Sequence, residues 1–378
     1  MKRLRVMHVV VGGDIGGAER VVADLATRPD ATGADHQVAL FTPNRGLAAY
    51  FERAGLHVHD RGPVRENPFA YVYRSFGPDA AWLAERVVAE GIDVVHTHTF
   101  GSHVLGTRAA RRAMARQLRT EHHVMHYFDP SCAAFTRWAA GRTDRFVAVS
   151  EYVRRVILET APRLANRMTV VRNGVDAAHF APPGEARPDF APADLPAGAA
   201  GGLRLAIVCR LTAWKRVHLA IEAVAATGAE LVVIGDGEDR GKLEALAAER
   251  GARVVFAGYQ ADPRPFVAAC DAVLSTADRE PLGLSVLEAQ ALARPVIAFA
   301  TGGIPEIVEH EGTGFLVDDA SADGLRAAIA RAQGDRAELA RMGARARRSV
   351  VERCSVDRMA EGYGAAYAET VAPTGRAP

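Results

Sequence analysis

Short apolar runs alternate with longer amphipathic stretches along the first half of the chain. The apolar runs are rich in Val, as buried strands are. These predicted strands are Arg5–Val11, Gln37–Phe41, His57–His59, Val94–Thr97, Leu118–Glu121, Phe146–Val149 and Thr169–Val171. The helical stretches between them include Ala18–Thr27, Ala80–Glu90, His103–Arg116 and Glu151–Glu159. The alternation predicts a parallel sheet with helices on both faces.

A second series of the same kind follows a change in composition. Residues 182–202 are rich in Pro, Ala and Gly, which is typical of a linker or a surface loop. The predicted strands beyond it are Arg204–Cys209, Glu230–Ile234, Arg253–Phe256, Ala272–Ser275, Val296–Phe299 and Gly314–Val317. The predicted helices include Val217–Ala226, Arg240–Glu249, Ser285–Ala293 and Asp323–Gln333, followed by an Ala-rich helical tail, Arg336–Thr370.

The chain is therefore predicted to be an α/β protein with two doubly wound, Rossmann-like domains that face each other across a cleft. The predicted bounds are 1–180 for the N-terminal domain, 181–202 for the linker and 203–355 for the C-terminal domain. Ligands bind such sheets beyond the carboxyl ends of the strands. Residues that directly follow a strand are thus the first candidates for function.

Charge narrows the classes of function. The chain has 46 basic and 45 acidic side chains and a formal net charge of +1. This balance gives no electrostatic reason to expect nucleic acid as a partner. Lysines occur only at Lys2, Lys215 and Lys242, which makes Lys215, placed just after a predicted strand, more informative than an average basic residue.

The cysteines and the apolar segments predict a cytoplasmic protein. The four cysteines lie far apart and no pair has metal-ligand spacing, so we expect reduced thiols. The apolar segment Leu4–Val11 is too short to span a bilayer and is interpreted as the first buried strand, not as a signal peptide. No other stretch is long and apolar enough to cross a membrane, so no integral membrane segment is expected.

The strongest motif consists of two carboxylates with seven residues between them, in the second half of the chain. Glu280 lies in the loop after the predicted strand Ala272–Ser275, and Glu288 lies inside the helix that begins near Leu284 or Ser285. Gly283 allows backbone N–H groups to approach a ligand, and the N-terminus of a helix is suited to a diphosphate. The alternative is an ordinary helix whose acid-rich first turn is stabilised by the helix dipole.

Two other loops follow strands of the same predicted domain. Arg210 and Lys215 come directly after the strand that ends at Cys209, and two cations there suit a diphosphate leaving group. The segment Thr301-Gly-Gly-Ile-Pro-Glu306 follows the strand Val296–Phe299, and its glycines allow a tight turn against a ligand. The alternatives are a pair of solvated cations and a plain loop.

The N-terminal half offers a glycine-rich loop and several histidines. Gly16 and Gly17 belong to a loop between the first strand and the first helix, where a phosphate or a sugar can approach the backbone. His96 and His98 share one face of a strand end, and His98 is the better functional candidate because it lies closer to the strand's carboxyl end. A structural role is the alternative for both. The cluster of His122, His123 and His126 leaves a metal site open, although no matched Cys or carboxylate spacing supports one.

Aromatic and cationic side chains concentrate on two stretches of the N-terminal half. Because most of the phosphate-binding candidates lie after residue 200, we expect these stretches to bind a second ligand with a sugar or an anionic group. The candidates are Arg65, Tyr71 and Arg74 in the stretch 62–77, and His123, His126 and Tyr127 in the stretch 122–138. One alternative is that some of these aromatic rings pack beneath the loops. Another is a peripheral membrane contact, since arginines near aromatic residues also suit anionic lipid headgroups.

Together these motifs resemble the retaining glycosyltransferases of family 4, which have the GT-B architecture. The Glu280–Glu288 spacing matches the family, and the segment EAQALARPVIAFATGGIPEIV that continues from Glu288 is typical of its donor domain. The glycine-rich start matches at GGAERVV and the approach to the linker matches at VRNGVD. Arg216 and Cys209 depart from the pattern, because Gly is common at both positions in the family.

The resemblance implies roles for these residues. Arg210 and Lys215 would neutralise the β-phosphate as it leaves. Glu280 would contact the donor sugar, Glu288 the ribose, and His98 would lie near the sugar. The backbone near Gly16, Gly17, Gly283, Leu284 and Ser285 would hold the phosphates. The last segment, 356–378, would form a helix that crosses back to the N-terminal domain.

The resemblance also implies the reaction. A sugar, expected from UDP, would pass to an unidentified acceptor hydroxyl with retention of configuration, by front-face attack and without a protein nucleophile. No metal and no cofactor are expected, because two cations and a helix N-terminus already compensate the diphosphate and no Asp-x-Asp motif ends a strand. The alternative is a nucleotide-sugar 2-epimerase of the same architecture, which needs acid–base groups and no acceptor.

Overall fold

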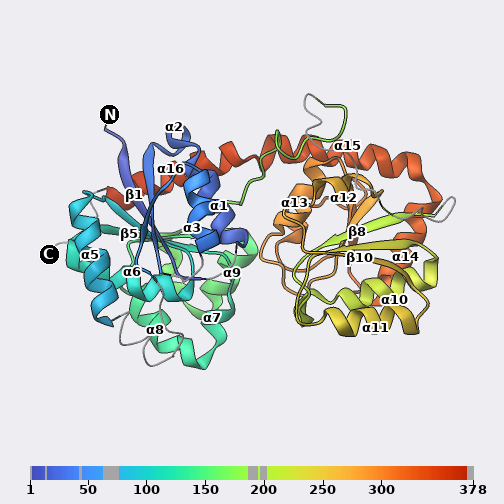
Figure 1. Ribbon diagram of the computed structural model, residues 1–378, viewed down its shortest axis with the longest axis horizontal. Helices are drawn as coiled ribbons and strands as arrows, with labels where there is room; N and C mark the ends of the chain where they lie inside the picture. The colour runs from blue at the N-terminus through green and yellow to red at the C-terminus, as the bar shows by residue number, and fades with distance from the viewer. Residues whose placement is uncertain are drawn as a thin grey trace. The chain divides into compact units, whose positions relative to one another are not determined.

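The protein folds into two compact units. The computed structural model describes residues 2–12, 15–41, 45–62, 76–185, 195 and 202–372. One unit combines Met1–Asn173 with Val356–Pro378, and the other is Gly174–Ser355 (Figure 1). The first passage between units thus falls at Asn173–Gly174, near the predicted boundary at residue 180, and most of the predicted linker lies outside the described residues.

The N-terminal unit is built on a parallel sheet. In its described part the sheet has seven strands in the order β3-β2-β1-β4-β5-β6-β7. The strands are β1 Leu4–Val10, β2 Ala34–Leu40, β3 His57–Asp60, β4 Val94–Thr97, β5 Arg116–Glu121, β6 Arg145–Ala148 and β7 Met168–Val170. Each predicted strand of this half overlaps one of them, so the apolar runs located the sheet correctly.

Helices cover both faces of this sheet. They are α1 Gly17–Ala26, α2 Pro29–Thr32, α3 Arg45–Arg53, α5 Pro78–Ala89, α6 Phe100–Ala113, α7 Met125–Phe128, α8 Pro130–Ala140, α9 Glu151–Thr160 and α16 Val356–Val371, with a 3-10 turn η1 at Pro162–Arg167. Met7 and Val9 of β1 pack on the side of α5 and α6. Val6 and Val94 pack on the side of α1 and α16. Because side chains alternate along a strand, His8 and His96 also point to the α16 face.

The C-terminal unit repeats the design with a six-stranded sheet in the order β10-β9-β8-β11-β12-β13. Its strands are β8 Arg204–Val208, β9 Glu230–Ile234, β10 Arg253–Gly258, β11 Ala272–Ser275, β12 Val296–Phe299 and β13 Gly314–Val317. Its helices are α10 Val217–Thr227, α11 Arg240–Glu249, α12 Arg264–Ala268, α13 Leu284–Ala291, α14 Ala322–Gly334 and α15 Arg336–Arg353, with 3-10 turns η2 at Ala213–Lys215 and η3 at Ile304–Glu306.

The helical tail Arg336–Thr370 consists of two helices, and the second begins at Val356, the first residue of the last segment that the resemblance implied. Helix α15 ends at Arg353 and α16 begins at Val356. Cys354 between them has a non-helical backbone with φ −131° and ψ 32°. Its carbonyl accepts a hydrogen bond from the Val175 N–H at 2.9 Å. The tail is divided between the two units at this point. Helix α15 belongs to the C-terminal unit, and α16 packs on the N-terminal sheet.

Each sheet reverses its strand order once. The reversal lies between β1 and β4 in the N-terminal unit and between β8 and β11 in the C-terminal unit. Loops that follow strands beside such a reversal form the usual ligand crevice of doubly wound sheets. The glycine loop and His98 follow β1 and β4, while Lys215 and Glu280 follow β8 and β11. Among the described residues, no helix combines the length and the apolar composition needed to span a bilayer.

Candidate active site

The structure brings a predicted cation and a predicted carboxylate of the C-terminal unit together. Lys215, the last residue of η2, places Nζ 2.5 Å from Oε2 of Glu280. Their side chains are only 15% and 13% exposed. The ammonium also lies 4.1 Å from the centre of the Trp214 ring. Two residues 65 positions apart in sequence therefore form one ion pair at the strand-order reversal.

Hydrogen bonds to backbone carbonyls hold together the loops that carry this pair. The Thr276 hydroxyl, after β11, donates to the Lys215 carbonyl at 2.6 Å. The Asp278 N–H donates to the Trp214 carbonyl at 3.1 Å. The Thr301 hydroxyl, after β12, donates to the Ala277 carbonyl at 2.8 Å. Loops from three neighbouring strands thus hold one another, which pre-organises the charged groups.

The two glycines after Thr301 serve a close approach to Glu280. Gly302 has φ +62°, and a Cβ there would lie 2.0 Å from the Glu280 carbonyl oxygen. The Gly303 N–H donates to that same carbonyl at 2.8 Å. Only glycine, which has no Cβ, allows this loop to approach the Glu280 backbone so closely. The loop thereby supports the segment that positions the Glu280 carboxylate.

Helix α13 begins where the spacing of the two glutamates predicted. Gly283, with φ +100°, precedes Leu284 and provides no side-chain cap. The first N–H groups of the helix, on Leu284 and Ser285, have no acceptor within the helix and are oriented as anion-binding groups. Glu288 lies one turn further and is 8% exposed. The N-terminus of this helix is therefore open to an oxyanion.

The structure shows the surroundings of Arg216 and Cys209, the two residues that depart from the family pattern. Arg216 has φ +52°, a left-handed conformation that explains why Gly is common there, and its Nη2 donates to the Ala320 carbonyl at 2.7 Å. Cys209 is largely buried, which raises the pKa of its thiol to about 11. Arg210, the other predicted cation, is exposed directly after Cys209. Neither departure therefore removes a charge from the site.

In the N-terminal unit, the glycine loop leads into α1. Gly16 precedes the helix with an extended backbone, and Gly17 is its first residue. The Gly16 N–H donates a hydrogen bond to Oε2 of Glu19 at 3.0 Å. A ligand phosphate would therefore have to compete with this carboxylate for the N–H group. Gly13 and Asp14 of the same loop lie outside the described residues.

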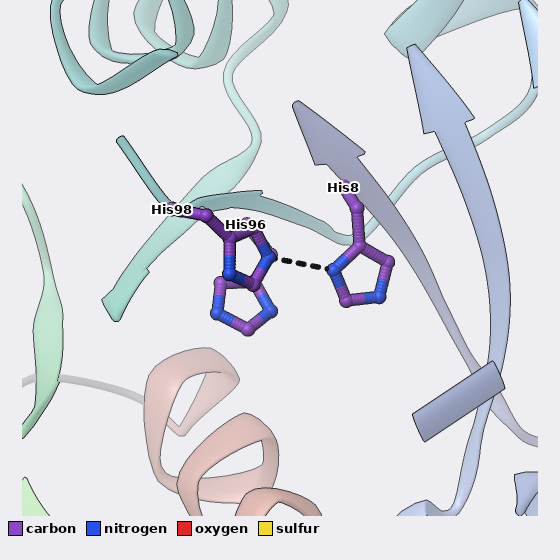
Figure 2. Close-up of side chains that lie close together, drawn as sticks. All are labelled: His8, His96 and His98. Carbon is purple, nitrogen blue, oxygen red and sulfur yellow. Dashed lines mark hydrogen bonds between the residues drawn. The ribbon is translucent and has the colours of Figure 1, made fainter. Parts of the chain in front are cut away.

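His98 lies inside a cluster of imidazoles and is only 2% exposed. Figure 2 shows the rings of His8, His96 and His98 turned toward one another. Nε2 of His98 lies 2.9 Å from Nδ1 of His8, and its Nδ1 lies 3.1 Å from Nε2 of His122. Burial, reinforced by the neighbouring histidines, lowers the pKa of His98 well below its usual value. The ring is thus neutral, and both of its nitrogens are already hydrogen-bonded.

His96 is held separately by the C-terminal helix. Its Nδ1 lies 2.9 Å from the Tyr367 hydroxyl of α16, and its Nε2 lies 2.8 Å from the Thr120 hydroxyl. The rings of His96 and His98 are 4.1 Å apart, in accord with the shared face that their spacing indicates. His8 was not among the residues predicted from the sequence. Its spacing of two residues from Val6 puts both side chains on one face of the first strand, but the neighbouring strand β4, which carries His96, is known only from the structure.

The residues considered for acceptor binding, from the stretches 62–77 and 122–138, differ in burial and contacts. Arg65, Tyr71 and Arg74 lie outside the described residues. His123 is exposed, but His126 is only 4% exposed. The Tyr127 hydroxyl points inward and donates to Oε1 of the buried Glu121 at 2.8 Å.

Glu121 forms the centre of a buried charged cluster beneath this loop. Its Oε2 lies 2.9 Å from Nη2 of Arg119 and 3.2 Å from Nε2 of His126. Burial alone would raise the pKa of Glu121, but Arg119 and His126 outweigh it and hold that pKa well below its usual value. His126 and Tyr127 therefore anchor the loop, and His123 remains the exposed candidate of the three.

Comparisons with known proteins identify the class. The family model described as glycosyltransferase family 4 matches residues 15–179, and the model described as glycosyl transferases group 1 matches residues 200–349. The GDP-mannose-dependent alpha-(1-6)-phosphatidylinositol monomannoside mannosyltransferase of Mycobacterium tuberculosis is 30% identical over 308 residues, which are 75% of this chain and 78% of that protein. The chain belongs to this family of glycosyltransferases.

Other relatives agree with this assignment. The lipopolysaccharide core biosynthesis glycosyltransferase LpsE of Rhizobium meliloti is 36% identical over 152 residues, a match that spans 39% of this chain and 45% of LpsE. The structure of HepE from Anabaena in complex with UDP and glucose has the same fold, with a TM-score of 0.79, 22% identity, and coverage of 95% of this chain and 98% of HepE. The fold is thus GT-B. The related enzymes are transferases, which does not favour the 2-epimerase alternative.

Proposed function

We propose that the chain transfers a hexose from a UDP-sugar to an acceptor hydroxyl, with retention of configuration and without a metal ion. The observation that carries the proposal is the Lys215–Glu280 ion pair, 2.5 Å long, at the strand-order reversal of the C-terminal sheet. It lies in the loops that lead to α13, whose first N–H groups are suited to a phosphate. UDP bound to HepE supports uridine as the base.

In this proposal the two cations stabilise the leaving group. Negative charge grows on the β-phosphate as its bond to the sugar breaks, and Lys215 and Arg210 provide positive charge at that position. Lys215 already lies beside a carboxylate, so a bound diphosphate and Glu280 share its ammonium group. Glu280 then faces the sugar hydroxyls, and Glu288, one turn into α13, accepts hydrogen bonds from the ribose.

Retention follows from front-face attack. The acceptor hydroxyl attacks the anomeric carbon on the side of the leaving phosphate, and a phosphate oxygen takes its proton. No protein nucleophile is required. The Cys209 thiol, which lies near the cations, stays protonated because burial raises its pKa to about 11. His98 is neutral and both of its ring nitrogens are hydrogen-bonded, to His8 and His122, so its proposed role near the sugar is to hold neighbouring groups in place and not to act as an acid.

The proposed acceptor is a hydroxyl of a small molecule, a glycolipid or a polysaccharide precursor. The mannosyltransferase relative is named for a phosphatidylinositol mannoside acceptor and LpsE for lipopolysaccharide core biosynthesis, which supports a lipid-linked glycan. We place the reaction in the cytoplasm, with peripheral contact to a membrane when the acceptor is lipid-linked. The exposed His123 belongs to the proposed acceptor side.

A donor panel tests the proposal. The protein is incubated with UDP-glucose, UDP-galactose, UDP-N-acetylglucosamine and GDP-mannose, and slow release of nucleoside diphosphate is measured. We expect hydrolysis of a UDP-sugar and, by NMR of the first-formed sugar, the α-anomer from an α-linked donor. Release from GDP-mannose alone would overturn the choice of base. A β-anomer would overturn retention, and conversion of a donor to its 2-epimer would restore the isomerase alternative.

A further inference from the structure

Four histidines form a continuous hydrogen-bonded row across the N-terminal sheet. His36 of β2, His8 of β1, His98 after β4 and His122 after β5 follow one another across four neighbouring strands. Nδ1 of His36 lies 2.9 Å from Nε2 of His8. Nδ1 of His8 lies 2.9 Å from Nε2 of His98, and Nδ1 of His98 lies 3.1 Å from Nε2 of His122. Figure 2 shows the middle of this row.

Every link has the same polarity, because each joins Nδ1 of one ring to Nε2 of the next. A neutral imidazole has one N–H donor and one acceptor nitrogen. Once one ring carries its proton on Nε2, its neighbours must do the same, since otherwise two N–H groups or two lone pairs would face each other. The row therefore has only two satisfied arrangements, all Nε2–H or all Nδ1–H.

Thr32 lies at the inner end of the row and favours one of them. Its hydroxyl oxygen lies 2.9 Å from Nε2 of His36. Backbone carbonyls also compete for the single hydroxyl proton, Arg28 at 3.1 Å and Pro29 and Ala34 at 3.4 Å each. With the proton directed to a carbonyl, the oxygen can only accept from His36, which sets Nε2–H there and in the three rings that follow.

We propose that Thr32, His36 and His8 are positioning residues that hold His98 and His122 in the Nε2–H tautomer. The lone pair on Nδ1 of His122 is then a fixed hydrogen-bond acceptor just beyond the carboxyl end of β5. Among the described residues none bonds to this nitrogen. Its use toward a hydroxyl of the substrates rests on the proposed function, whereas the tautomer itself is a property of the folded chain.

Every hydrogen bond within the row can form while all four rings are neutral. Burial lowers the pKa of His36 to about 4 and that of His122 to about 3, so no ring carries a charge near pH 7. The same nitrogens argue against a metal ion. The ring nitrogens of His8, His96 and His98 that approach within 4.8 Å of one another all have hydrogen-bond partners. Metal binding would have to break several of these bonds.

Histidine NMR of the whole protein, labelled with ¹⁵N in its imidazoles, tests the proposal without any substrate. Long-range ¹H–¹⁵N correlations distinguish the two tautomers, and single histidine substitutions assign the signals. We expect all four rings in the Nε2–H form at pH 7. Rings in different tautomers, or a row wholly in the Nδ1–H form, would overturn the proposal. So would stoichiometric displacement of the His8 and His98 signals by added ZnCl₂.

A matched pair of variants then tests the influence of Thr32. Thr32→Val removes the acceptor for His36, and we expect the four signals to shift together toward the Nδ1–H form. Thr32→Ser should restore them. Thr107→Val is the control, because this buried hydroxyl bonds to the His103 carbonyl at 2.7 Å and lies outside the row. If His98 and His122 keep their tautomer in Thr32→Val, the proposed coupling is wrong.

Turnover adds a second readout. With UDP-glucose as the probe, we expect kcat/KM of Thr32→Val to fall about 3- to 10-fold, the effect of one misdirected neutral hydrogen bond, and that of Thr107→Val to stay within about twofold. Equal losses in both variants would reduce Thr32 to a stability role. A protein inactive on every nucleotide sugar would overturn the proposed function and leave the NMR result intact.

Discussion

The two units share a doubly wound sheet but place their polar groups differently. In the C-terminal unit the site is a pair of charges on loops beyond the strands, and His179, His218 and His310 are all exposed. In the N-terminal unit polar groups enter the sheet itself. Five of its histidines are buried: His8, His96, His98, His103 and His126.

The difference reflects what each kind of group can tolerate. A diphosphate needs full positive charge, and the cost of holding the Lys215 ammonium at 15% exposure is offset by its ion pair with Glu280. A hydroxyl needs only a neutral partner, and a neutral imidazole is buried at little cost where both of its nitrogens are hydrogen-bonded, as in His8, His96 and His98. The C-terminal site should therefore be sensitive to the loss of charge, and the N-terminal network to the gain of it.

The largest expected effect is the response of the N-terminal unit to acid. Burial lowers the pKa of His8, His96 and His98 well below the usual value, so the folded state binds fewer protons than the unfolded one. Stability is complete above the unfolded pKa of about 6.5 and falls below it by about 1.4 kcal/mol per pH unit for each such histidine. His36, whose pKa burial lowers to about 4, adds its own loss of stability between about pH 6.5 and about pH 4.

Native-state hydrogen exchange at pH 7.0 and pH 5.0, corrected for intrinsic rates, measures this effect in each unit. Amides of β1, β4 and β5 should lose protection at pH 5.0, whereas those of β8, β9 and β11 should keep most of theirs. His218→Ala, at an exposed site of the C-terminal unit, is the control and should change neither pattern. An equal loss in both units would contradict the contrast between them.

The second effect is loss of turnover when the cations are removed. Lys215→Ala and Arg210→Ala should each lower the rate of donor hydrolysis about 100- to 1,000-fold, because each removes a stabiliser of the leaving diphosphate. Lys242→Ala is the matched control. The Lys242 side chain is 82% exposed, and its ammonium group forms an ion pair with Asp239. Unchanged rates in folded Lys215→Ala would make this ion pair a structural one.

The third effect separates the two glutamates. Glu288→Ala should weaken UDP binding about 10- to 100-fold, because hydrogen bonds to a charged group are lost in substrate and product alike. Glu280→Ala should slow transfer but leave UDP affinity within about threefold, since its removal also frees Lys215 for the phosphates. Calorimetric titration with UDP gives both affinities, and equal losses would refute the division of roles.

The smallest effect should come from chelation. With two cations and a helix N-terminus at the proposed diphosphate site, donor hydrolysis in EDTA should remain within about twofold of its rate in buffer alone. An activity that disappears in EDTA and returns with Mn²⁺ or Mg²⁺ would show that a metal ion, not Lys215 and Arg210, compensates the diphosphate.

The sequence was sufficient to predict the strands and to locate the loops that carry Lys215 and Glu280, because their signals are local. Val-rich runs mark buried strands, and Gly283, Gly302 and Gly303 mark backbone that approaches other groups closely. Errors at element ends also have local causes. Helix α6 begins at Phe100, three residues before the prediction, because the Thr99 side chain accepts a hydrogen bond from the Ser102 N–H.

What the sequence did not predict depends on contacts between distant residues. The imidazole row requires the register of β2, β1, β4 and β5 within one sheet, which the spacing of the apolar runs along the chain does not give. Tyr127 looked like an acceptor-binding residue because its type and loop position suit that role. Its inward orientation is set by the buried Glu121, whose partnership with Arg119 the spacing alone does not show.

The most direct test of the account is hydrogen–deuterium exchange of the protein with and without saturating UDP. The account predicts that UDP slows exchange most at amides of 283–287 and 301–304, with a smaller effect at 212–216 and little change in β4 and β5. Protection confined to the N-terminal unit, or absent from the start of α13, would contradict the claim that the C-terminal loops bind the nucleotide.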